Sequence, residues 1–247
     1  MPTPQSSPTP KPVTETWRPG LVGLPRLTPG RRLFRSVSRA LVRAFVRFWT
    51  TPKVTGMEHF PEKGPAIVVI NHLGDADAVV IFSILPTFIE ALAKIELYDL
   101  RFYGWFMHTY GVIWLHRGRP DRRALRAALD GLAEGRIIGI APEGRESLTG
   151  SLEEGTQGAA WLALKADAPV IPIAVTGTEN ERIYDGLHRW RRTPVAVAVG
   201  KPFRLEQLPD SRQAIESGTR RIMLALAELL PPEYRGVYAD FPAPSEL

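Results

Sequence analysis

One histidine and two aspartates stand close together in a short turn of the sequence, and these residue types can move protons. The stretch 71–77 reads Asn-His-Leu-Gly-Asp-Ala-Asp, between a β-branched apolar run that predicts a buried strand and a second apolar run that predicts a helix. On a regular helix, His72 and Asp77 would lie about 140° apart, so they can meet only through an irregular turn. Gly74 permits such a turn. If the two side chains meet, Asp77 can hold one imidazole nitrogen while the other takes a proton.

The same turn also has a plainer interpretation. Asp75 or Asp77 would be the N-cap of the following helix, and His72 would be a loop histidine with satisfied hydrogen bonds. These residues alone leave both interpretations open.

The elements that must position this turn alternate between strands and helices. Strands are expected at 53–56, 66–70, 91–94, 111–115, 137–141, 169–175 and 195–199, and helices at 31–50, 78–85, 121–133, 152–165 and 219–230. This alternation predicts an α/β fold with a mixed, largely parallel sheet flanked by helices. A chain of 247 residues can bury one sizeable core.

Composition excludes several classes of site. The chain has no cysteine, so it has no disulfide framework, thiol nucleophile or thiolate metal site. It has no Gly-x-Ser-x-Gly elbow, phosphate loop, dinucleotide turn or His-Glu-x-x-His sequence, and its five histidines are scattered, so no metal site is expected. We found no apolar run of about 18 residues and no secretory signal. These features predict a cytoplasmic protein, or one held on the cytoplasmic face of a membrane.

The N-terminal region carries most of the positive charge. Residues 1–50 hold nine basic residues and one acidic residue, whereas the remainder holds 22 basic and 25 acidic residues. Residues 1–30 are rich in proline, serine and threonine and are expected to be a disordered or extended leader.

A strongly amphipathic helix is expected at 31–50. One face carries Arg31, Arg32, Arg35, Arg39, Arg43 and Arg47, and the opposite side carries Leu33, Phe34, Val37, Leu41, Phe45 and Phe48, with Trp49 near the end. This pattern is typical of a helix that lies in a membrane interface, peripherally or monotopically. The alternatives are a surface helix with solvated arginines and a nucleic-acid contact, for which the downstream sequence offers no support.

Two further strand ends carry charged residues. Arg117 follows the strand at 111–115, where an anionic group could bind. The sequence Pro142-Glu143-Gly144-Arg145-Glu146-Ser147 follows the strand at 137–141. An aromatic-rich segment at 102–110 is either core or the wall of a slot for an apolar ligand.

These motifs together resemble those of the glycerolipid acyltransferases, and most closely the bacterial 1-acylglycerol-3-phosphate acyltransferases. The four matching segments are Asn71-His72 with Asp77, Gly111 to Arg117, Pro142-Glu143-Gly144 with Ser147, and Ala168 to Pro172. They occur in the family's order and approximate spacing, across roughly residues 50–200. The resemblance implies an acyltransferase domain over 51–247.

The resemblance also implies a mechanism and roles. His72 would be the general base that takes the proton of an acceptor hydroxyl, which attacks the thioester of an acyl-CoA or acyl-carrier protein, and Asp77 would fix its tautomer. Arg117 would bind the acceptor's phosphate, with the third motif shaping that pocket and Pro172 in the nearby wall. The expected product is phosphatidic acid, in phospholipid biosynthesis, and no cofactor is implied. The implied site residues are His72 and Asp77 for catalysis, Arg117, Glu143, Gly144, Arg145 and Ser147 for the acceptor, and Asn71, Gly111 and Pro172 in support.

The third motif departs from the family pattern, which usually runs Phe-Pro-Glu-Gly-Thr-Arg-Ser. Arg145 replaces the usual threonine and Glu146 replaces the usual arginine. A carboxylate at that position should repel a phosphate. The sequence therefore keeps two other hypotheses open, namely an acceptor without a phosphomonoester, such as a lysolipid or glycolipid hydroxyl, and a non-catalytic lipid-binding protein.

Overall fold

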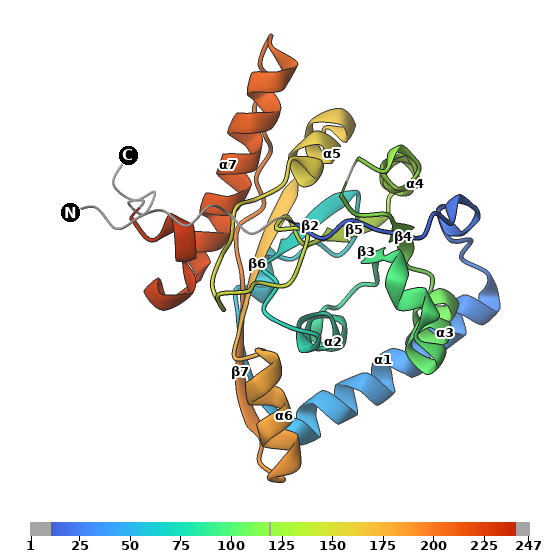
Figure 1. Cartoon of the computed structure of the whole chain (residues 1–247), viewed down its shortest axis with the longest axis vertical. Helices are drawn as coiled ribbons and strands as arrows, with labels where there is room; N and C mark the ends of the chain where they lie inside the picture. The colour runs from blue at the N-terminus through green and yellow to red at the C-terminus, as the bar shows by residue number, and fades with distance from the viewer. Residues whose placement is uncertain (1–10, 119, 241–247) are drawn as a thin grey trace.

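Seven strands form one mixed sheet in a computed structural model that describes residues 11–118 and 120–240 (Figure 1). The order across the sheet is β1-β7-β6-β2-β5-β3-β4. Five of the six neighbouring pairs are parallel, and only β6 and β7 are antiparallel. The strands are β1 (Thr50–Thr55), β2 (Ala66–Ile70), β3 (Ile89–Lys94), β4 (Ile113–Leu115), β5 (Ile137–Ile140), β6 (Val170–Thr176) and β7 (Thr193–Val199). The predicted α/β class and the largely parallel sheet are confirmed.

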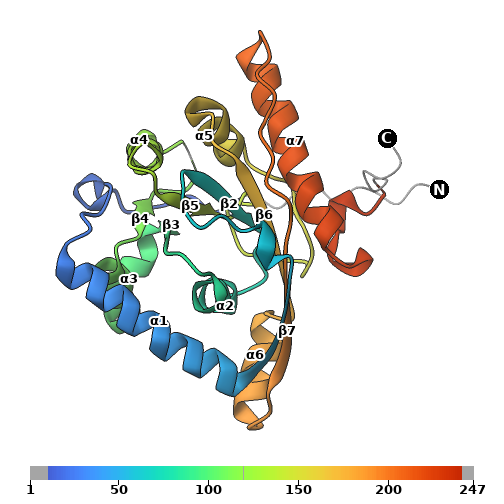
Figure 2. The same ribbon diagram turned by 180° about the vertical axis from the view of Figure 1, so that it is seen from behind.

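Helices cover both faces of the sheet, as the two opposite views show (Figures 1 and 2). The helices are α1 (Pro29–Trp49), α2 (Ala76–Ile84), α3 (Arg101–Tyr110), α4 (Arg122–Ala133), α5 (Gly158–Ala166), α6 (Asn180–His188) and α7 (Ser211–Leu229). Short 3₁₀ turns lie at Pro19–Leu21, Met57–His59, Ile95–Asp99, Pro232–Tyr234 and Gly236–Tyr238. Helices α4, α5 and α7 lie on one face, and α2 lies on the other with α1 outside it.

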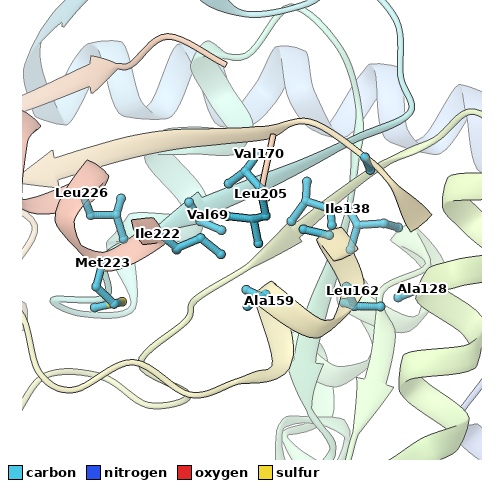
Figure 3. Packing of buried hydrophobic residues seen from close by; sticks show 14 of the residues in the cluster. Val69, Ala128, Ile138, Ala159, Leu162, Val170, Leu205, Ile222, Met223 and Leu226 are labelled. Carbon is cyan, nitrogen blue, oxygen red and sulfur yellow. The ribbon is translucent and has the colours of Figure 1, made fainter. Parts of the chain in front are cut away.

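The alternating sides of the strands feed two separate cores. Val69 and Ile138 pack against α5 and α7 on one face, where Figure 3 shows Leu162, Ile222 and Leu226 closing over them. On the other face, Val68 and its neighbours pack against α2 and the end of α1. Such a doubly covered sheet explains why the strands read as continuous apolar runs.

Most predicted elements are present, but helix α3 was not predicted, and helix α7 begins at Ser211, eight residues before its predicted start. Two further elements also differ. The helix expected at 152–165 begins only at Gly158, because the backbone of 153–156 hydrogen-bonds to Pro142 and Glu143 in the preceding loop. Helix α6 was not predicted, and its residues are polar and largely exposed.

The N-terminal segment lies against the domain from residue 11 onward. Part of the predicted leader, residues 1–10, is outside the described residues. Thr14 exchanges hydrogen bonds with the backbone of Arg117, and Trp17 stacks on His116 with ring centroids 4.2 Å apart. Residues 11–18 therefore form an extended strap, one of the two expected forms of the leader, and this strap is held against the domain.

Helix α1 turns several of its arginines toward the body of the protein, a direction that the sequence did not predict. Arg35 is buried and forms a bidentate ion pair with Glu90 at 2.6 and 2.9 Å. Arg39 and Arg43 donate to backbone carbonyls at the C-terminal end of α2, where cations are favoured. The apolar residues of α1 instead form an exposed stripe, 50–67% exposed, consisting of Leu33, Val37, Leu41, Phe45 and Phe48. Within the described residues, we found no helix with the length and apolarity needed to span a membrane.

Candidate active site

The histidine and aspartate of the 71–77 turn meet at the carboxyl end of β2. The Nδ1 atom of His72 lies 2.8 Å from Oδ2 of Asp77. The turn is tight at Gly74, where an added Cβ would lie 2.5 Å from Oδ1 of Asn180. Glycine at this position therefore permits the close approach of a neighbouring segment. The φ of Gly74 lies outside the left-handed region, so the turn itself does not need the backbone freedom that was expected of it.

Asp77 is a positioning group and not a helix cap. Its Oδ2 also accepts hydrogen bonds from the backbone N–H groups of Leu73 and Gly74, at 2.6 and 3.0 Å. Asp75 occupies the N-cap position of α2, but its side chain makes no capping bond. Three donors thus converge on one carboxylate oxygen, and the plainer interpretation of the turn does not describe this geometry.

Neighbouring residues fix the turn from two sides. Asn71 exchanges two hydrogen bonds with the backbone of Val175 in β6, at 2.7 and 2.9 Å. Glu143 accepts from the backbone N–H of His72 at 3.0 Å and from that of Glu153 at 2.8 Å. Burial raises the pKa of Glu143 to about 7, despite these two donors and the nearby imidazole. Glu143 therefore connects the loop of the third motif, residues 142–147, to the backbone of His72.

The open nitrogen of His72 faces a second carboxylate. Oε1 of Glu146 lies 4.0 Å from Nε2 of His72 and 3.8 Å from Nζ of Lys94. Nδ2 of Asn180 donates to the other oxygen of Glu146 at 3.4 Å. The sequence comparison marked Glu146 as a departure from the family pattern, but neither Lys94 nor Asn180 was assigned to the site.

These carboxylates set the basicity of His72. Burial opposes its protonation, but the hydrogen bond and charge of Asp77, together with the charges of Glu146 and Glu143, outweigh burial and raise the pKa of the imidazole. A raised pKa makes His72 a stronger base for a hydroxyl proton.

The cations expected to bind the acceptor are paired with carboxylates. Nη2 of Arg117 lies 3.5 Å from Oε1 of Glu96, and Nε of Arg117 is buried with no hydrogen-bond partner in the part of the chain that the structure describes. Arg145 pairs with Glu153 at 2.6 Å. An anionic acceptor would therefore compete with these carboxylates for the guanidinium groups.

The remaining predicted site residues contribute through their backbone or by packing in the sheet. Ser147 donates its backbone N–H to the carbonyl of His72 at 2.7 Å. Gly144 and Gly111 have φ values of +75° and +93°, which favour glycine. Pro172 is buried in β6 opposite Val69 and does not line the cavity described next.

An apolar cavity of about 210 Å³ adjoins the dyad. Its wall includes His72 and Asp77 and continues between α1, α2 and α3, through Val42, Phe82, Tyr103, Phe106, Met107 and Tyr110. The aromatic segment at 102–110 therefore faces in two directions. Phe106 and Tyr110 line the cavity, whereas Phe102 and Trp105 are exposed. The described residues contain no cluster of histidine and acidic side chains that could hold a metal ion.

The chain is similar in sequence to known acyltransferases. Residues 51–176 match the sequence profile of the family described as Acyltransferase. A 1-acyl-sn-glycerol-3-phosphate acyltransferase of Borreliella burgdorferi is 32% identical over 130 residues, which cover 51% of this chain and 52% of that protein. The enzyme of that name from Bacillus subtilis is 27% identical over 153 residues, covering 61% of this chain and 73% of that protein. A yeast relative of the same name, from Saccharomyces cerevisiae, is 32% identical over 170 residues, covering 65% and 54%.

The fold also matches a solved structure. The crystal structure of a 1-acyl-sn-glycerophosphate acyltransferase from Thermotoga maritima superposes with a TM-score of 0.59 at 23% identity, covering 79% of this chain and 81% of that one. The chain spans 52–62% of the length of the curated relatives from Borreliella burgdorferi and mouse. The family profile covers half of the chain and includes the dyad, Arg117 and the third motif, and the chain therefore belongs to the acyltransferase family.

Proposed function

We propose that this protein transfers a fatty acyl group from acyl-CoA or acyl-carrier protein to the free hydroxyl of 1-acylglycerol-3-phosphate. The product would be phosphatidic acid, a precursor in phospholipid biosynthesis. The observation that carries the proposal is the His72–Asp77 dyad, whose Nδ1–Oδ2 distance is 2.8 Å, set in the wall of an apolar cavity. The names of the relatives favour this acceptor.

The proposed reaction needs no covalent enzyme intermediate. Nε2 of His72 takes the proton of the acceptor hydroxyl as its oxygen attacks the thioester carbonyl. The tetrahedral intermediate then expels the thiolate, which takes the proton back from the imidazolium. Asp77 holds His72 in the tautomer that is protonated at Nδ1, and it stabilises the imidazolium. The apolar cavity would hold a fatty acyl chain next to these atoms.

We propose that the protein acts at the cytoplasmic surface of a membrane. The exposed apolar stripe of α1 presents leucine, valine and phenylalanine side chains to the surroundings, and large exposed apolar patches mark membrane or partner contacts. The cavity lies on the inner side of the same helix, with Val42 in its wall. Docking through α1 would bring lysolipid and acyl chains close to the dyad.

One observation favours a second candidate acceptor. Glu146 lies 4.0 Å from the nitrogen that would receive the proton, so a phosphate one carbon away from the reacting hydroxyl would meet a carboxylate. An acceptor without a phosphomonoester, such as a lysolipid or glycolipid hydroxyl, would avoid that repulsion.

A thioester-release assay tests both candidates. The protein receives palmitoyl-CoA with lysophosphatidate or with a panel of phosphate-free lysolipids, and an acyl-carrier-protein donor follows if CoA fails. We expect turnover that disappears in His72→Ala and persists in the control His59→Ala, since His59 contacts the carbonyl of Val199 instead of the dyad. Turnover only with phosphate-free acceptors selects the second candidate. No turnover with either donor leaves a lipid-binding protein.

Two substitutions test the acceptor assignment. Glu146→Arg restores the usual family residue, and we expect it to lower the Michaelis constant for lysophosphatidate. Arg117→Ala should raise that constant and leave the donor's constant unchanged. An unchanged acceptor constant in Arg117→Ala would refute the role of Arg117 in phosphate binding.

A further inference from the structure

The turn between α6 and β7 presents a large aromatic side chain that the proposed reaction does not use. The turn reads Arg189-Trp190-Arg191-Arg192, and from the sequence alone it is most simply a solvated basic loop. Trp190 is 78% exposed and has a φ of +53°. Non-glycine residues rarely adopt this left-handed conformation, and bulky ones least of all. An exposed tryptophan held in a disfavoured backbone conformation points to a functional contact and not to stabilisation of the fold.

Trp190 continues the exposed apolar surface of α1. Its ring centroid lies 5.1 Å from that of Trp49, which lies 5.1 Å from the ring of Phe48 and 6.4 Å from that of Phe45. Figures 1 and 2 both place α6 beside the C-terminal end of α1. The stripe of α1 and the tip of the turn are therefore one continuous surface.

Hydrogen bonds hold the turn in that position. Arg192 donates to the carbonyl of Arg47 at 2.8 Å and to that of Thr50 at 2.7 Å. A hollow of about 350 Å³ lies between the two segments, lined by Arg47, Phe48, Trp49, Trp190 and Arg192. Its lining thus consists of aromatic rings and guanidinium groups.

Several arginines lie at this end of the surface. Arg35, Arg39 and Arg43 of α1 bond inward to the body of the protein. Arg31 and Arg32 donate to backbone carbonyls near the start of the helix. Arg47 and Arg191 are exposed, next to the hollow. Arg189 is neutralised in part by Asp185 at 2.6 Å. The 189–192 turn and the last turn of α1 thus carry positive charge that can complement an anionic membrane.

We propose that the 189–192 turn is a second membrane contact, which binds the phosphate groups of anionic phospholipids while Trp190 enters the interface beside the stripe of α1. The proposal rests on the docking of α1 suggested above. Tryptophan favours the level of the lipid headgroups, and juxtamembrane arginines are attracted to anionic lipid. A bilayer of anionic phospholipid supplies both the apolar and the charged partner, whereas free phosphate would use only the arginines.

Vesicle co-sedimentation of the full chain tests the proposal without any assay of activity. The vesicles contain phosphatidylcholine alone or with added phosphatidylglycerol. Arg191→Glu should weaken binding to the anionic vesicles by about 25-fold, or about fivefold per unit of charge lost, with little effect on neutral vesicles. Trp190→Ala should weaken binding to both by about tenfold, and Trp190→Phe should restore most of it. The charge-matched control is Arg212→Glu on α7, where the arginine is 86% exposed.

Several outcomes would overturn the proposal. If Trp190→Ala and Arg191→Glu bind like the unaltered chain while Leu41→Asp does not, α1 docks alone. If Leu41→Asp also binds normally, or if the unaltered chain binds neither vesicle, docking of α1 fails as well. An equal loss in Arg212→Glu would mean that net charge alone drives binding. Release from anionic vesicles by inorganic phosphate at constant ionic strength would mean a soluble-anion site. A dimer in light scattering that Trp190→Ala dissociates would assign the surface to a second copy.

Discussion

Replacing Asp77 with asparagine tests how this site holds its histidine. In a dyad where the carboxylate meets only the imidazole, asparagine can turn its amide nitrogen toward Nδ1 and force the proton onto Nε2, which costs about 10⁴-fold in rate. Here Oδ2 of Asp77 accepts from His72 and also from the backbone N–H groups of Leu73 and Gly74. An amide nitrogen at that position would face two N–H donors, which it cannot accept.

The energies favour an asparagine that keeps its oxygen toward His72. The inverted amide would leave two backbone donors without partners, at about 1–3 kcal/mol each. The correct orientation puts the amide nitrogen where Oδ1 of Asp77 is buried without a partner in the described residues, so it leaves one group unpaired, at about 1–3 kcal/mol. His72 should therefore keep its proton on Nδ1, and the free energy of unfolding should fall by about 1–3 kcal/mol.

The remaining catalytic loss comes from charge. A hydrogen bond to an ionised acceptor contributes about 1–2 kcal/mol more than one to a neutral acceptor, which corresponds to about 5- to 30-fold in rate. Because the charge of Asp77 helps to raise the pKa of His72, the acid limb of the pH–rate profile should also move to lower pH. Steady-state kinetics of Asp77→Asn over a range of pH measures both effects. A loss near 10⁴-fold with an unmoved acid limb would refute the argument from three donors.

Three other perturbations have defined outcomes. Arg35→Met should lower the free energy of unfolding by about 3 kcal/mol, the lower end of the cost of breaking a buried ion pair, because Glu90 loses its bidentate partner and keeps only the 3.4 Å contact with Arg136; chemical denaturation measures this. Activity should fall as the pH drops through the raised pKa of His72, since the base form is lost there, and Glu146→Gln should shift that fall to lower pH because it removes one charge that raises the pKa. Ala91→Phe should narrow the apolar cavity and lower kcat/KM for long-chain thioesters by about tenfold relative to short ones.

Each of these three predictions has an outcome that would contradict it, and the first also has a control variant. Arg39→Met removes an exposed bond to a carbonyl of the chain and should cost under about 1 kcal/mol; an equal loss in both variants would mean that Arg35 acts only through helix packing. An acid limb that does not move in Glu146→Gln would separate Glu146 from the base. Equal losses for all chain lengths in Ala91→Phe would place the acyl chain elsewhere.

Much of the fold was accessible from sequence because it depends on local signals, whereas the dyad followed from the family resemblance, since the residues of the turn alone left two interpretations open. The strand predicted at 66–70 has those bounds in the structure, and the following helix ends before Pro86 as expected. His72 and Asp77 are five residues apart and meet through a turn in which Gly74 leaves room for Asn180. For the strand and the helix, periodicity or backbone restriction acts within a few residues.

The residues that pair across the site could not be found in this way. Lys94 and Asn180 reach Glu146 from segments 52 and 34 residues away in the chain. The same limit applies to α1, whose helical period predicted an amphipathic helix but not the direction of its arginine face. That direction depends on Glu90, which is 55 residues from its partner Arg35, because a buried carboxylate makes the inward position favourable for a guanidinium group.

The same pairing determines what an acceptor must do at this site. Arg117, Arg145 and Lys94 each lie against a carboxylate, those of Glu96, Glu153 and Glu146. A phosphate that binds one of these cations must displace an anion that is already in place, so its net gain is smaller than the strength of the new pair alone. A neutral headgroup needs no such exchange and can hydrogen-bond to the carboxylates as well as to the cations. The choice between the two proposed acceptors therefore depends on the difference between two ion pairs, and Glu146, which lies closest to the reacting nitrogen, is the residue whose replacement should change that choice most.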